Sequence, residues 1–128
     1  MTEKELHKQI CQYLSIQYPK VRFNTDLSGL KLSIGQSVQI KKLRSNSGWP
    51  DIFIAHKSEH FNGLFLEVKK DASEIWLKNG EIKNNTHINE QWEMLTYLNN
   101  QGYYAFWAYS FDQAKRIIDN YMNNKFVL

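Results

Sequence analysis

The spacing of apolar residues predicts a helix at the start of the chain. Four apolar side chains recur every three or four positions and therefore share one helical face: Leu6, Ile10, Tyr13 and Leu14. Thr2, followed three residues later by Glu5, forms the capping-box pattern of a helix start. Pro19 predicts that this helix ends before it.

Two further helices are predicted in the second half of the chain. The first covers residues 86–100, and Gly102 can cap its C-terminal end. Its apolar stripe consists of Ile88, Trp92, Leu95 and Leu98. Membership of this stripe predicts that Trp92 is a core residue. The last helix follows a second capping-box pattern, Ser110 with Gln113. Its apolar residues are Phe111, Ala114, Ile117, Ile118 and Tyr121.

Short apolar runs predict strands at residues 21–24, 52–55, 63–69 and 103–109, the last with a buried Trp107. The polar residues 56–62 predict a hairpin connection. Residues 37–44 fit either a short helix or a strand. In the polar segment 70–85, Asn79-Gly80 predicts a type I′ turn at the tip of a small flap. The order helix, strands, helix, strand, helix predicts an α/β fold with one mixed sheet.

Composition narrows the class of protein. A length of 128 residues fits one domain over residues 1–128. The 42% hydrophobic and 14% aromatic content excludes a disordered tail or a coiled-coil rod. Cys11 is the one cysteine, which excludes an internal disulfide and a cysteine zinc cage and fits a reducing cytoplasm. The N-terminus has no apolar signal core and no run approaches a membrane span, so we expect no membrane partner.

Two carboxylates and a lysine are predicted to meet at one edge of the sheet. Glu67 and Lys69 lie two residues apart in a strand and therefore emerge on one face. If residues 52–55 and 63–69 pair as a hairpin, Asp51 lies beside them. Burying such charges is unfavourable unless they are paired or bind a metal. Two carboxylates are typical protein ligands of Mg²⁺, whereas an exposed Glu–Lys pair is the alternative without a metal.

These residues form the pattern Pro50-Asp51, fifteen intervening residues, then Glu67-Val68-Lys69. The pattern resembles the core motif of the PD-(D/E)xK nuclease superfamily. Its context extends the resemblance: Ser-Gly-Trp-Pro-Asp-Ile-Phe-Ile, then Gly-Leu-Phe-Leu-Glu-Val-Lys, then Glu90-Gln91 in a helix, is similar to the VRR-NUC family of replication-repair nucleases. The resemblance implies a restriction-endonuclease-like αβββαβ core, in which helices flank a mixed central sheet. The long segment 70–86 departs from the family's usual layout.

The resemblance also implies roles for individual residues. Asp51, Glu67 and the Val68 backbone carbonyl would bind Mg²⁺ or Mn²⁺, and Lys69 would be the catalytic lysine. A glutamate on the first helix of family members faces the site as a further catalytic and metal-binding group. Glu3 fits this position, because the capping box already uses Glu5.

Gln91 matches the glutamine that family members carry at the start of the helix after the ExK strand, where it could hold a water or a phosphate oxygen. His87 lies four residues earlier on the same helical face and is a candidate for contact with phosphate, or an ordinary surface histidine. Ser47 could bond Asp51 or a phosphate, with a turn serine as the alternative. Trp49 is a candidate for stacking on a base or for wedging open a DNA junction. Trp76 could cover the site, contact DNA or pack against a second subunit.

The net charge of +3 allows a nucleic-acid partner without requiring one. Residues 27–50 hold Lys31, Lys41, Lys42 and Arg44 and no acidic residue. This stretch is either a solvated surface or a patch that contacts phosphates.

Together these features predict a metal-dependent, structure-directed DNA endonuclease of replication, recombination or repair, in the cytoplasm of a bacterium or a phage-infected host. Lys69 would orient a water that attacks in line and leaves a 5′ phosphate. A homodimer would supply the two cuts that a four-way junction needs. The alternatives are a non-catalytic DNA-binding module with a degenerate nuclease site and a metal-free structural or interaction protein.

Overall fold

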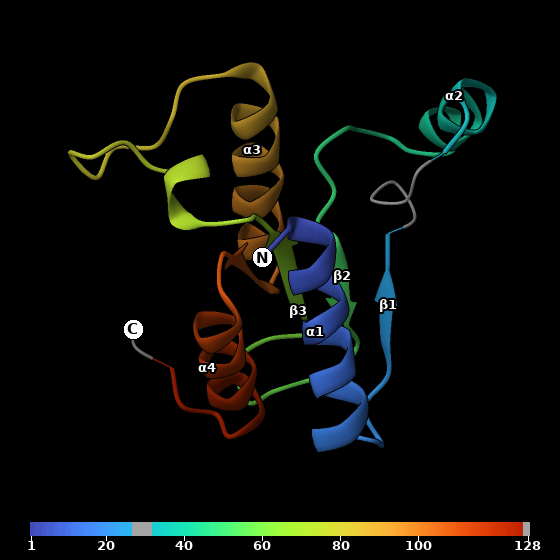
Figure 1. Cartoon of the computed structure of the whole chain (residues 1–128). Helices are drawn as coiled ribbons and strands as arrows, with labels where there is room; N and C mark the ends of the chain where they lie inside the picture. The colour runs from blue at the N-terminus through green and yellow to red at the C-terminus, as the bar shows by residue number, and fades with distance from the viewer. Residues whose placement is uncertain (27–31, 127–128) are drawn as a thin grey trace.

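The computed structural model describes residues 1–26 and 32–126. Its helices and strands run along the chain in the order α1 (Glu3–Gln17), β1 (Phe23–Thr25), α2 (Ile34–Lys42), β2 (Ile52–Ile54), β3 (Leu64–Val68), the short 3-10 helix η2 (Ala72–Glu74), α3 (Thr86–Asn100), β4 (Tyr104–Ala108) and α4 (Phe111–Met122). Figure 1 shows this arrangement. The predicted α/β class and the mixed sheet are confirmed, and the ambiguous segment before residue 45 is helical.

The four strands form one sheet in the order β1-β2-β3-β4. The pairs β1–β2 and β2–β3 are antiparallel, whereas β3 and β4 are parallel. In the β2–β3 hairpin Ile52 lies opposite Leu66, which places Asp51, one residue earlier, at the end of β3 that carries Glu67. The chain passes from β3 to the parallel strand β4 through α3, because parallel strands need a long crossover connection, which is usually a helix.

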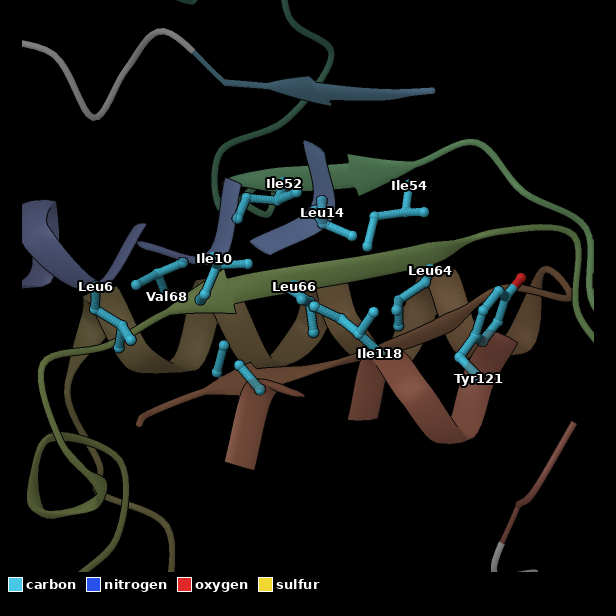
Figure 2. Packing of buried hydrophobic residues seen from close by; sticks show 12 residues of the cluster. Leu6, Ile10, Leu14, Ile52, Ile54, Leu64, Leu66, Val68, Ile118 and Tyr121 are labelled. Atoms are coloured by element: carbon cyan, nitrogen blue, oxygen red, sulfur yellow. The ribbon is translucent and has the colours of Figure 1, made fainter. Parts of the chain in front are cut away.

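Helices cover both faces of the sheet. On one face, α1 and α4 pack against the alternate residues of β2 and β3, as Figure 2 shows for Ile10, Leu66 and Ile118. The Asp119 side chain on α4 accepts hydrogen bonds of 2.6 and 2.7 Å from the hydroxyls of Tyr13 and Tyr18, which joins α4 to α1. On the other face, α3 forms a second cluster with Phe65 and the fully buried Trp107.

Two segments lie outside these layers. Helix α2 has a capping box formed by Ser33 and Gln36, yet none of its residues is buried. Figure 1 shows it at the upper right, apart from the sheet. The segment after η2 forms the predicted flap, in which Trp76 pairs with Ile82 and packs edge-on against Tyr109 with the ring centroids 5.5 Å apart. This packing anchors the flap to the core, which differs from the three roles considered for Trp76 from the sequence.

Three details of the sequence prediction are wrong. Trp92 is 43% exposed and stacks on Trp107, because α3 instead turns Gln91 into the interior. In the flap turn only Gly80 has a positive φ, 86°, whereas a type I′ turn needs positive φ at both central residues. The Gln113 side chain does not close a capping box on Ser110. It accepts from the Tyr109 N–H and donates to the Trp107 carbonyl, so Ser110 alone caps α4.

Candidate active site

The β2–β3 hairpin fixes the first carboxylate. Asp51 precedes β2, and its side chain accepts a hydrogen bond of 2.7 Å from the backbone N–H of Val68. Its backbone carbonyl accepts a bond of 2.7 Å from the N–H of Asp26, which extends the β1–β2 ladder. Burial raises the pKa of Asp51, and the bond from Val68 lowers it. The carboxylate is thus held at the edge of the sheet by the backbone of both neighbouring strands.

Glu67 is the most buried acidic residue of the site. Its side chain is 3% exposed and accepts a hydrogen bond of 2.7 Å from the Gln91 amide at one oxygen, Oε1. The other oxygen, Oε2, is buried and accepts no hydrogen bond among the described residues. The Asp51 and Glu67 carboxyl groups are close enough to share a proton, which favours the protonated form of Glu67. Burial, followed by repulsion from Asp51, raises the pKa of Glu67 well above its ordinary value, while Lys69 lowers it. Keeping this carboxylate ionised therefore opposes folding, because Lys69 offsets only part of the effect of burial and of Asp51.

Lys69 provides a positive charge beside the carboxylates. It follows β3, its backbone N–H donates to the Ala108 carbonyl at 2.8 Å, and only 5% of the residue is exposed. Glu3, at the start of α1, interacts electrostatically with Lys69, Asp51 and Glu74; burial raises its pKa and Lys69 lowers it. Glu5 forms the capping box with Thr2 through bonds of 3.1 Å in both directions. The structure therefore places Glu3, and not Glu5, toward the site.

Gln91 connects the site to α3. Its Nε2 donates to Glu67 and lies 3.1 Å from Nε2 of His87, one helical turn earlier. With the amide hydrogens directed at Glu67 and His87, the Gln91 carbonyl oxygen is left buried and without a partner among the described residues. His87 itself is exposed. Its contact is thus with a residue of the site and not, within this structure, with the carboxylates.

The donor set fits a hard divalent cation. Asp51, the free Glu67 oxygen and the Val68 carbonyl are all oxygen donors, which Mg²⁺ and Mn²⁺ prefer. Among residues 1–26 and 32–126, no three His, Cys, Asp or Glu side chains are grouped so as to hold a metal ion. Two carboxylates with solvent in the remaining positions are what Mg²⁺ usually takes from a protein. Glu3 lies within electrostatic range of Asp51 without completing a group of three.

The segment before β2 packs closely on α3 next to the site. Gly48 has a φ of 86°, and a Cβ added there would meet the Glu90 carbonyl oxygen at 2.7 Å. Ser47 donates a hydrogen bond of 2.9 Å to the Glu90 side chain, which differs from the bond to Asp51 considered from the sequence. Only glycine permits this approach, so Gly48 positions Asp51 relative to Gln91. Sequence reasoning missed this role, because a lone glycine gives no sign of what it approaches.

Only part of the predicted basic patch is exposed and free to contact a phosphate. Lys41 and Lys42 are exposed at the C-terminal end of α2, and Lys31 lies outside the described residues. Arg44 forms an ion pair with Asp26, a partner that the sequence pattern did not suggest.

Trp49 is half-buried and packs against the α3 cluster beside Asp51. Among the described residues, no helix is long and apolar enough to span a membrane.

Comparison with known proteins supports the fold. No family model matches the sequence, and neither does any curated protein. A solved structure described as a "VRR_NUC domain protein" matches 96% of this chain and 89% of its own length, with a TM-score of 0.66 and 23% sequence identity. The chain therefore has the α/β fold of that VRR_NUC domain protein, as its motif led us to expect.

Proposed function

We propose that the protein is a VRR-NUC nuclease, a metal-dependent and structure-directed DNA endonuclease. The observation that carries the proposal is the state of Glu67: a buried carboxylate beside Asp51, with one oxygen unpartnered and a raised pKa. A merely structural residue at this position would be apolar or fully paired, since an unpaired buried charge opposes folding. Strongly shifted acids in such a setting are characteristic of functional sites.

Asp51, Glu67 and the Val68 carbonyl would hold Mg²⁺ or Mn²⁺, with Glu3 beside them. When bound, the ion supplies Lewis acidity toward water and toward the scissile phosphate. The chain's own residues prepare the donors before the ion arrives. The Val68 N–H orients Asp51, and the Gln91 amide fixes one oxygen of Glu67 so that the other faces away from it.

Lys69 would act on the reacting groups. Its ammonium group lies in a largely buried position next to Glu67, where a charge interacts strongly with a developing negative charge on the phosphate. It would orient the attacking water and stabilise the pentacovalent phosphate, so that the 3′ oxygen leaves and a 5′ phosphate remains. The unpartnered Gln91 carbonyl is a second group that can accept a hydrogen from that water.

Substrate binding would be independent of sequence. Lys41 and Lys42 on the exposed α2 provide contacts to backbone phosphates, and such contacts position a duplex without reading its bases. A four-way DNA junction would need two coordinated cuts. A homodimer with one site in each copy is the simplest assembly that provides them.

The test uses linear, flapped and four-way DNA with Mg²⁺, Mn²⁺ or EDTA, together with calorimetric titration of Mg²⁺ into the protein. Glu67→Gln and Lys69→Ala should abolish metal-dependent cleavage, and Glu67→Gln should also weaken metal binding. Glu81→Gln and Lys78→Ala are matched controls, because both residues are exposed in the flap. Binding of DNA without cleavage under every metal would favour the non-catalytic module. Absence of both would contradict either DNA function.

A further inference from the structure

A groove opens directly beside Asp51. Its volume is about 530 Å³, within the range of about 300–1,000 Å³ that small-molecule pockets have. One wall is the segment before β2, including Leu43, Arg44 and Trp49. The floor is one face of β1 and β2, because Asn24 and Phe53 are directly paired in the ladder and Asp51 lies two residues before Phe53. The groove therefore meets the candidate active site at Asp51.

The charges in the groove do not suit a phosphate. Arg44 is the one cation among the described residues that line the groove, and it forms an ion pair with Asp26. Asp51 adds a further carboxylate at the end that meets the active site. Within residues 1–26 and 32–126, the groove thus offers an anionic group no unpaired cation, whereas a neutral heterocycle would not be repelled.

The apolar side chains of the groove suit a flat ring. Trp49 and Phe53 both line it. One side of Phe53 is occupied by Phe65, with stacked ring centroids 4.4 Å apart. Trp49 also lines a second hollow on its α3 side, so the indole separates two spaces. Aromatic rings beside a phosphate-cutting site provide a stacking platform for bases of any sequence.

From these features, and resting on the proposed nuclease function, the geometry points to a binding site for one unpaired nucleobase next to the scissile phosphate. The strand that is cut leaves the base stack at this point, and the released base stacks on Trp49 above the Phe53 floor. The substrate class is thus DNA with an unpaired nucleotide at the cleavage position, in contrast to a continuous duplex. The base is accepted by its π-face, which agrees with cleavage independent of sequence.

The experiment combines a protein change with a substrate change. DNA carrying one unpaired nucleotide is compared with the same DNA in which an abasic residue replaces the nucleotide on the 5′ or the 3′ side of the cut. Loss of one stacking contact should raise KM by about 5- to 150-fold, either in Trp49→Ala or with one of the two abasic substrates. The two changes together should raise KM no further than either alone, since both remove the same contact. Trp49→Phe should restore most of the binding.

Trp92→Ala is the matched control, because Trp92 is exposed on α3 and lines neither hollow. It should leave KM unchanged. A second measurement places 2-aminopurine at the unpaired position: wild-type protein and Trp92→Ala should quench its fluorescence, whereas Trp49→Ala should not. Two results would overturn the base site while leaving the nuclease function intact. One is equal cleavage of continuous duplex and of both abasic substrates. The other is a multiplication of the KM effects of Trp49→Ala and of the abasic residue when both are present. Absence of cleavage on every DNA would instead contradict the proposed function itself.

Discussion

The Gln91 side chain donates a hydrogen bond of 2.7 Å to Glu67, and both side chains are at least nine-tenths buried. A neutral amide is the group best suited to this place. A carboxylate there would repel Glu67, and an ammonium would compete with a metal for the same oxygens. The amide satisfies one oxygen of Glu67 and leaves the other free.

Removing this amide should weaken metal binding more than it lowers the stability of the fold. Gln91→Met keeps the volume of the side chain but leaves Glu67 without its donor. Loss of a residue that orients a metal ligand lowers metal affinity or activity by about 10- to 100-fold. The measurement is cleavage rate as a function of Mg²⁺ concentration, with Gln101→Met, at an exposed position, as the control. An unchanged Mg²⁺ dependence in Gln91→Met would contradict an orienting role.

His87 should act through Gln91. Its ring nitrogen lies 3.1 Å from the amide nitrogen and can accept the second amide hydrogen. His87→Phe removes this acceptor and should lower the cleavage rate by about 2- to 12-fold, the equivalent of a hydrogen bond of about 0.5–1.5 kcal/mol. His87→Gln, which retains an acceptor, should recover part of the rate. In the Gln91→Met background His87→Phe should have no further effect, and a fully additive loss would show that His87 acts independently.

Stability should depend on pH through Glu67. Burial and Asp51 raise the pKa of this carboxyl above its ordinary value of 4.5, so the folded state holds the proton more tightly than the unfolded state does. The free energy of unfolding contributed by this group is fully present below pH 4.5 and is lost as the pH rises from there through the raised pKa. Without metal, Glu67→Gln should remove this loss, so that the variant is more stable than wild type at neutral pH. Urea unfolding in EDTA between pH 4 and pH 8 measures the difference, and Mg²⁺ should reduce it.

Gly48 should be required for the position of the Asp51 segment. Gly48→Ala forces a side chain into a positive-φ position and against the Glu90 backbone, and should destabilise the protein by about 1–3 kcal/mol. Gly35→Ala is the matched control: it lies in α2 with nothing within 4 Å of the added Cβ, and should stabilise that helix by up to about 1 kcal/mol. Thermal unfolding separates the two, and equal melting temperatures would contradict the close approach.

The sequence predicted what local pattern determines. The helix starts at Thr2 and Ser110, the end of α3 before Gly102, and the hairpin that brings Asp51 to Glu67 all follow from caps, periodicity and turn residues. The rotation of α3 did not follow. Apolarity placed Trp92 inside, but burial of the Glu67 carboxylate requires an amide facing it, and this need turns Gln91 inward. Such a pairing depends on a contact across 24 residues and leaves no periodic trace.

The Arg44–Asp26 pair and the approach of Gly48 to Glu90 have the same origin. Each joins segments that are distant in the chain, and neither partner is marked by its neighbours in sequence. The candidate residues of the site were thus identifiable one by one. Their mutual support was not, and it became visible only with the register of the sheet and the rotation of α3.

Helix α2 has no buried residue, and Ile34, Val38 and Leu43 in and after it remain exposed. Substitutions on its surface should leave the melting temperature almost unchanged, since the core does not include them. Evolution can therefore alter what this helix touches without endangering the fold or the carboxylates. A protein with an active site that opposes its own folding has little stability to spare. Under the proposed function, α2 carries DNA contacts outside the core, so single mutations there could change substrate preference without a detectable loss of stability.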